Sequence, residues 1–144
     1  MPSPAPITER LATLAREAVD AAFRVHSALG PGLLESVYET CLRHDLKRRG
    51  LNLRQQVAVP IIYDGLQLDA GLRLDLLIEE ELVVEVKAIE RILPVHEAQL
   101  LSYLKLARNG SADQFQCRAD QRRKGASRFE KSSCLFFVSS CLCG

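Results

Sequence analysis

Apolar residues recur every three or four positions over the first third of the chain. From about Ile7 to Leu29 this spacing predicts an amphipathic helix. It ends at Gly30-Pro31-Gly32, because proline disfavours a helical predecessor and glycine accepts a positive φ. A second helix is predicted from about Leu33 to Arg49, with Gly50 after its last turn. Its expected apolar stripe consists of Leu34, Val37, Cys41, Leu42 and Leu46.

The period then changes to two, which is the spacing of a β-strand. Residues 57–61 alternate up to Asp64-Gly65, a strong hairpin signal, and residues 66–76 alternate after it. A third strand is predicted from Leu82 to Ile89. A third helix follows from Leu93-Pro94 to at least Leu106, and its expected apolar face is Leu100, Leu101, Leu104 and Ala107. The predicted order is therefore α-α-β-β-β-α.

A unit of this kind usually continues into another strand parallel to the last one. Residues 109–131 are instead polar and aperiodic, and only residues 134–142 could form a strand. The segment from Cys134 to Ser139 is a candidate to pair with the sheet edge that the missing strand would leave open.

Three charged residues interrupt the apolar pattern of the predicted strands. Glu85 and Lys87 lie two residues apart on the third strand, so both point to the same side. Asp75 interrupts the apolar run of the preceding strand, where a charge is costly unless it is paired or binds a cation. Carboxylates on adjacent strands suit Mg²⁺, and a lysine beside them could orient water or neutralise a phosphate. The simpler interpretation is an ion pair on a solvated sheet face.

Polar residues on two helices add to this set. Gln99 and Tyr103 are an i, i+4 pair on the third helix, away from its leucine face. Glu35 and Tyr38 lie near the start of the second helix. Packing or capping is the simpler role for each residue alone, whereas together with the strand residues they would supply polar groups from four successive elements.

Composition and charge divide the chain near residue 106. Residues 1–103 contain 11 lysines and arginines against 15 acidic residues, whereas residues 104–144 contain 8 against 3. Four of the five cysteines also lie in the last 28 residues. Because no CxxC pair exists and the number is odd, neither a disulfide framework nor a zinc ribbon is expected. No apolar run approaches the roughly 18–20 residues that cross a membrane. The N-terminus lacks signal-peptide features, so we expect a cytoplasmic location.

Ordered motifs over about residues 7–106 resemble the GxxExxY proteins, a family of the PD-(D/E)XK nuclease-like superfamily. The name-giving motif is matched by Gly32-Leu-Leu-Glu35-Ser-Val-Tyr38. The further matches are Arg73-Leu-Asp75-Leu-Leu, Glu85-Val-Lys87-Ala and Leu93-Pro-Val-His-Glu-Ala-Gln99-Leu-Leu-Ser-Tyr103-Leu. The proline that often precedes the aspartate in this superfamily is replaced by Leu74.

The resemblance implies an α/β fold with a restriction-endonuclease-like αα-βββ-α core on a mixed sheet, here without its usual last strand. It implies that Asp75 and Glu85 hold the metal, that Lys87 is the catalytic lysine and that Glu35 is an acid carried by a helix. Gln99 and Tyr103 resemble the QxxxY element of RecB-type nucleases. The implied cofactor is Mg²⁺ or Mn²⁺.

The segment after residue 106 departs from the family. Members continue into a strand resembling Leu-Ile-Asn-Phe-Asn-Val, and codons for Ala112 to Cys117, read one nucleotide later, can encode that strand. We therefore expect a nuclease-like domain over residues 7–106 and an atypical basic, cysteine-rich tail over residues 107–144. The hypothesis for this tail is that it is a frameshifted translation of the family's last strand. The coding DNA across residues 104–125 tests this.

Two classes of function remain open from the sequence. The first is a metal-dependent nuclease that hydrolyses phosphodiester bonds of DNA or RNA. The second is a non-catalytic module of the same fold that binds nucleic acid or protein, which the acidic balance of residues 1–103 favours. An inactive, frameshifted product is a third possibility. An uncovered sheet edge would also allow self-association or a partner protein.

Overall fold

The computed structural model describes residues 8–69, 71–88, 93–96, 98–99, 102–103 and 106, and the backbone of residues 135–140. The chain begins with two helices, α1 (Glu9–Leu29) and α2 (Glu35–Arg48). The Thr8 side chain caps α1 by accepting a hydrogen bond from Leu11 N at 3.2 Å. Helix α1 ends at Gly30, whose φ of 73° confirms the stop predicted there.

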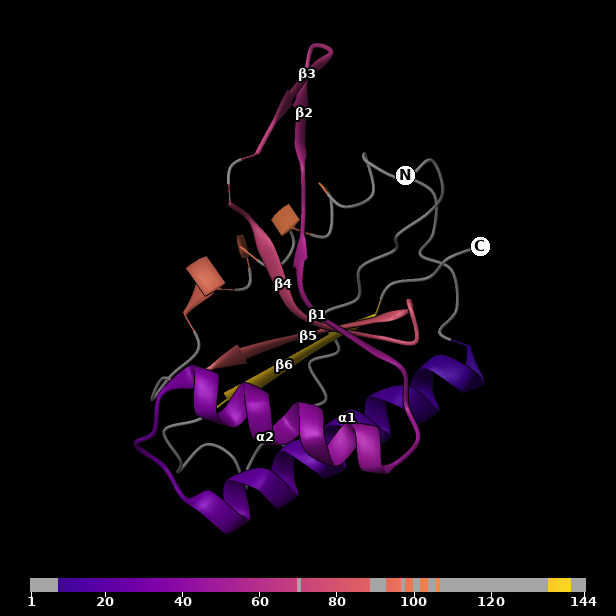
Figure 1. Ribbon diagram of the computed structural model, residues 1–144, viewed down its shortest axis with the longest axis vertical. Helices are drawn as coiled ribbons and strands as arrows, with labels where there is room; N and C mark the ends of the chain where they lie inside the picture. The colour runs from indigo at the N-terminus through magenta and orange to yellow at the C-terminus, as the bar shows by residue number, and fades with distance from the viewer. Residues whose placement is uncertain are drawn as a thin grey trace.

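Four strands form the main sheet in the order β1-β4-β5-β6 (Figure 1). They are β1 (Leu53–Ala58), β4 (Arg73–Ile78), β5 (Leu82–Lys87) and β6 (Leu135–Ser140). The three strand pairs described in this sheet are antiparallel. Together with the two helices the sheet gives the expected α/β, restriction-endonuclease-like arrangement. The prediction of a mixed sheet was wrong for the described strands, because β6 runs antiparallel to β5.

A separate two-stranded arm, consisting of β2 (Ile61–Tyr63) and β3 (Leu66–Leu68), projects from this sheet (Figure 1). Its turn residues, Asp64 and Gly65, have φ values of 48° and 77°, as the predicted two-residue hairpin requires. The long strands expected on either side of this turn are each divided in two. Pro60, which has no N–H for the ladder, lies at one of the two breaks.

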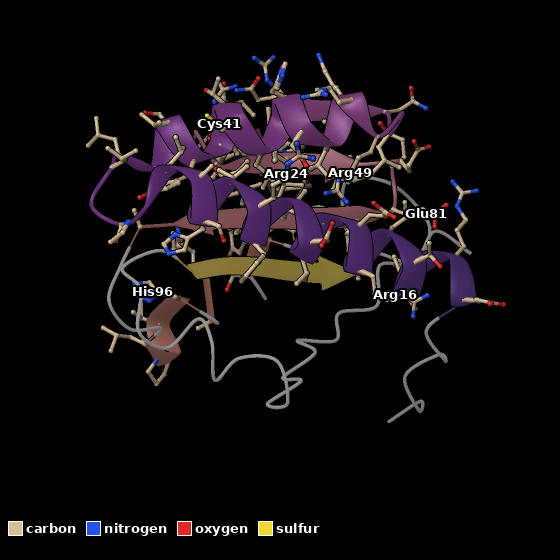
Figure 2. The ribbon with its side chains drawn as sticks, turned by 90° about the horizontal axis from the view of Figure 1, so that it is seen from below. Arg16, Arg24, Cys41, Arg49, Glu81 and His96 are labelled. Carbon is tan, nitrogen blue, oxygen red and sulfur yellow. The ribbon has the colours of Figure 1, made fainter. Side chains whose placement is uncertain are left out.

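The helices cover one face of the sheet. Helix α1 lies over β5 and β6, and α2 lies beside it over β1, β4 and β5 (Figure 2). The core on this face combines residues of both helices with alternate residues of β4 and β5, such as Leu76, Leu82, Val84 and Val86. A smaller cluster on the other face contains Val59, Leu74, Leu77 and Val83, and Tyr103 and Leu106 pack against it. The alternation predicted for β5 is thus confirmed.

The apolar stripe predicted for α2 was partly wrong. Leu34 is 75% exposed because it precedes the helix in extended backbone, and Val37 is also exposed. Leu42 and Leu46 are buried as predicted, and Tyr38, one turn before Leu42, takes the third position of the stripe. The rule that apolar residues form the buried stripe fails at Tyr38, because its hydroxyl has hydrogen-bond partners inside the fold.

Arg49 links the two helices at their outer surface. Its guanidinium donates to Glu17 on α1 and Asp45 on α2, at 2.8 and 3.0 Å, and it pairs with Asp20 at 2.8 Å (Figure 2). These carboxylates raise the pKa of Arg49 further above its already high ordinary value. The helix pair is therefore fixed by charge as well as by packing.

The described residues of the predicted third helix, 94–96, 98–99, 102–103 and 106, are helical. The leucines and alanine expected on its apolar face lie outside the described residues, as do Ile7, Ile89 and residues 107–134. The division of the chain at residue 106 and the frameshift hypothesis therefore stay predictions.

Strand β6 pairs with β5 along its whole length, from Leu82 opposite Ser140 to Lys87 opposite Leu135. The prediction that the segment after Cys134 pairs with the orphaned edge is thus confirmed. Because β6 occupies this edge of β5, the edge no longer supports the expected partner or self-association.

Candidate active site

The candidate site lies where β4 and β5 separate. These two strands pair only over Leu76–Ile78 and Leu82–Val84. Beyond that, β4 continues beside β1 to Arg73, and β5 continues beside β6 to Lys87. Figure 1 shows the two strands diverging. Continuing the register by one step places Asp75 opposite Glu85, at the mouth of the fork.

Asp75 reaches into this fork. Its Oδ2 accepts the main-chain N–H of Val86 at 2.8 Å, a donor that the separated β4 backbone does not satisfy. Its Oδ1 lies 3.5 Å from Nε2 of Gln56, at the limit of a hydrogen bond. The carboxylate is therefore held between the two neighbouring strands.

Glu85 is only 5% exposed, and its Oε1 has no hydrogen-bond partner among the described residues. Burial, followed by the nearby charge of Asp75, raises the pKa of Glu85 from 4.5 to about 8, and Lys87 partly opposes this rise. A buried carboxylate without full compensation is costly unless a proton or a cation neutralises it. The environment of the Glu85 carboxylate is thus suited to hold either a proton or a cation.

Lys87 lies on the same side of β5 as Glu85. Its Nζ is 4.0 Å from Glu85 Oε2, and 19% of its side chain is exposed. The ammonium group therefore borders both the buried carboxylate and solvent. The pair is long for an ion pair, so Lys87 can also act on a group that enters from solvent.

Glu35 approaches the same end of β5 from the first turn of α2. Its Oε1 accepts the main-chain N–H of Ala88 at 3.1 Å, one residue beyond Lys87. Glu35 is exposed, in contrast to Glu85. The helix-borne acid Glu35 is therefore far from Lys87 in sequence but close to it in space, and it lies at the rim of the site.

Tyr38, the last residue of the Gly32–Tyr38 motif, holds the turn before Glu35. Its buried hydroxyl donates to Gly30 O at 2.6 Å and accepts the N–H of Leu33 at 3.2 Å. This fixes the backbone between the two helices. The motif therefore has a structural part, Tyr38, and a part that faces the site, Glu35.

Gln99 and Tyr103 bond to one another, with Gln99 Nε2 donating to the Tyr103 hydroxyl at 2.8 Å. Tyr103 packs on the cluster that contains Val83 and Leu77, which is the sheet face that carries Glu85. The i, i+4 pairing is as the sequence indicated. Tyr103, with Gln99 bonded to it, therefore lies over the sheet face that carries Glu85.

Sequence reasoning missed two residues of the site, Gln56 and Glu39. Gln56 lies in β1 between Gln55 and Val57, which pair with Leu76 and Leu74 on either side of Asp75, and its φ of 50° is unusual for a residue other than glycine. Its Nε2 donates to both carboxylate oxygens of buried Glu39, at 3.0 and 3.2 Å, as well as approaching Asp75. Gln55 also donates to Glu39. The signal available was a pair of glutamines inside an otherwise alternating strand.

The donor set fits a Mg²⁺ or Mn²⁺ ion held by few protein ligands. No group of three or more histidine, cysteine or acidic side chains in the described part of the chain is placed to share a metal. Asp75 and Glu85 supply two carboxylates, and Glu85 Oε1 is an unused oxygen. Mg²⁺ commonly binds one or two carboxylates and completes its shell with water and substrate phosphates. Two carboxylates therefore suffice.

A family model described as the PD-(D/E)XK nuclease superfamily matches residues 12–122. The chain belongs to this superfamily. Nucleases of the superfamily generally use divalent metal ions, and membership suggests a nuclease-like function with a nucleic-acid substrate. Neither the curated proteins nor the solved structures contain a match to the chain. No helix in the described residues is long and apolar enough to span a membrane.

Proposed function

We propose that this chain is a metal-dependent phosphodiesterase of the nuclease type, acting on DNA or RNA in the cytoplasm. The observation that supports it best is the pair of carboxylates at the fork: Asp75 is fixed by Val86 N–H, and buried Glu85 keeps an unpartnered oxygen beside it. The two carboxylates repel each other when both are ionised, and a divalent cation bound between them would offset that repulsion.

Asp75 and Glu85 would hold Mg²⁺ or Mn²⁺, which when bound polarises a phosphoryl oxygen and lowers the pKa of water. Lys87 borders solvent and Glu85, so it would orient the attacking water and stabilise negative charge that develops on the phosphate. Glu35 at the rim would accept a proton from that water or add a ligand. Gln99 and Tyr103 would position the lysine or the phosphate.

Cleavage of labelled DNA and RNA oligonucleotides in the presence of Mg²⁺ or Mn²⁺ tests the proposal. Glu85→Ala and Lys87→Ala should each lower cleavage by roughly 100-fold or more. Glu80→Gln, at an exposed acid in the turn after β4, is the matched control and should cleave like the wild type. Metal-dependent cleavage that is unchanged in both active-site variants would refute the assigned roles.

A non-catalytic module that binds nucleic acid or protein on the same fold is the second candidate. The observation that favours it is the acidic balance of residues 1–103, with 11 lysines and arginines against 15 acidic residues, which offers no obvious basic groove for a phosphate backbone. Such a module would bind oligonucleotides or a protein with the same affinity in EDTA as in Mg²⁺, and would leave oligonucleotides intact. A nuclease would differ in both respects.

A further inference from the structure

The arm formed by β2 and β3 has one entirely apolar face. Tyr63 lies opposite Leu66 and Ile61 opposite Leu68, and alternate residues of a strand share a face. Tyr63 is 74% exposed and Leu66 is 58% exposed. The other face carries Ile62 opposite Gln67. The arm is thus an amphipathic ribbon whose apolar face is left open to solvent.

Such an arm is a candidate to bind another surface. A two-stranded hairpin is marginally stable by itself, and contiguous exposed apolar side chains on a protein surface mark interaction sites. Figure 1 shows the arm projecting from one end of the molecule, away from both helices. The four apolar side chains of its face would be buried if another surface received the arm.

The charge of the arm indicates what kind of surface this is. Residues 59–72 contain Asp64 and Asp69 and no lysine, arginine or histidine. Asp64 is at the tip, and Asp69 directly follows β3. A phosphate backbone would be repelled by these carboxylates. The surface that fits is a protein surface with apolar walls and positive charge.

A groove of this character lies between α1 and α2, with a volume of about 570 Å³. Its apolar lining comes from Val25, Ala28, Leu29 and Cys41, and its positive lining from Arg24, Arg43 and Lys47. Asp45, its acidic residue, is already paired with Arg49 at 3.0 Å and Arg24 at 3.7 Å. Arg43 Nε has no hydrogen-bond partner among the described residues. The groove therefore has net positive charge to offer an acidic occupant.

We propose that the β2–β3 arm of one chain docks into the α1–α2 groove of a second copy. Tyr63 and Leu66 would contact the apolar lining, and Asp64 would approach Arg43 or Lys47. The arm and the helices lie at opposite ends of the molecule, so a chain does not reach its own groove (Figure 1). A two-fold dimer, in which each arm enters the partner's groove, uses both surfaces and closes the assembly.

Light scattering after size-exclusion chromatography of the full chain tests this. At micromolar concentration the molar mass measured for the wild type should be twice the chain mass of 16.0 kDa. An arm variant, Tyr63→Glu with Leu66→Glu, and a groove variant, Arg43→Glu with Lys47→Glu, should each elute at the single-chain mass. The control is Ile62→Ser on the other face of the arm, which should stay dimeric.

Mixing the two variants separates a lost contact from a lost fold. One intact groove and one intact arm remain in the mixture, so native mass spectrometry with one variant isotope-labelled should detect a mixed dimer. A monomeric wild type would overturn the proposal. It would equally be overturned by a dimer that survives either variant, or by variants that do not combine. None of these measurements depends on nuclease activity.

Discussion

The Asp75 carboxylate accepts the main-chain N–H of Val86 at 2.8 Å, across the gap where β4 and β5 part. A side chain thus replaces a rung of the sheet ladder. It satisfies a donor that the separation of the strands would otherwise leave unpaired, and it sets Asp75 beside Glu85. The same fork that opens the sheet also positions the two carboxylates.

Replacing Asp75 should therefore cost stability in a way that depends on the substituent. Asp75→Ala leaves the Val86 N–H unpaired and should lower the free energy of unfolding by about 1–3 kcal/mol. Asp75→Asn keeps an acceptor oxygen and should lose less. Urea denaturation near pH 6 measures the stability of both variants. This pH is below the raised pKa of Glu85, about 8, so charge repulsion between residues 75 and 85 contributes little to the comparison. Equal losses would show that the Val86 bond contributes nothing.

Gln56 offers a test of backbone strain at the site. At an ordinary strand position glycine is less stable than alanine, but the φ of 50° at Gln56 penalises any side chain. We therefore expect Gln56→Gly to be more stable than Gln56→Ala by about 1 kcal/mol. Both lose the bonds to Glu39, so their difference isolates the backbone. Thermal denaturation of the pair measures it, and an alanine variant that is the more stable would contradict the strained conformation.

Tyr38 should act on stability and not on metal binding. Tyr38→Phe keeps the buried ring but removes the hydroxyl from between Gly30 O and Leu33 N. The expected loss is about 1–3 kcal/mol in the free energy of unfolding. Mn²⁺ affinity should be unchanged where the variant is folded. A loss of metal binding without a loss of stability would assign the hydroxyl to the site itself.

Glu85 should make the metal-free protein less stable at alkaline pH. Its pKa is raised to about 8 in the fold, against 4.5 ordinarily, so the folded state retains a proton that the unfolded state has lost. This contribution is complete below about pH 4.5 and disappears as the pH rises through about 8, a change on the order of a few kcal/mol.

Denaturation in EDTA from about pH 5 to about pH 9 compares the wild type with Glu85→Gln, which has no proton to lose at this position. The variant should gain stability relative to the wild type as the pH rises. Glu80→Gln is the control and should follow the wild type. Parallel curves for the wild type and Glu85→Gln would mean that the pKa of Glu85 is close to its ordinary value.

Periodicity and turn chemistry were enough to predict much of the fold. The helical spacing, the stop at Gly30 and the Asp64-Gly65 turn each depend on residues close in sequence, so local rules apply. The division of the long hairpin was not predicted, because alternation continues through Leu66 and Leu68 although both are exposed. Alternation indicates a strand but not what covers it.

Part of the site could be predicted from the sequence, because some of its charged residues interrupt an otherwise apolar strand pattern. Asp75, Glu85 and Lys87 are such exceptions, and the structure brings them together. Glu39 and Gln56 were missed because their roles depend on each other across 17 positions of sequence. The left-handed backbone conformation of Gln56 has no signal in the neighbouring sequence, because it is the contacts of its side chain with Glu39 and Asp75 that stabilise it. That Tyr38 and not Val37 faces the core likewise follows from acceptors and donors in the preceding turn.

Titration calorimetry with Mn²⁺ tests most directly whether Asp75 and Glu85 form a cation site. The wild type should bind the ion, Asp75→Asn and Glu85→Gln should each lose that binding, and Glu80→Gln should bind like the wild type. Because neutral amides replace the two carboxylates with little change in shape, loss of affinity would report the charge of the site. An absence of binding in the wild type, or binding that survives in Asp75→Asn, would contradict the account.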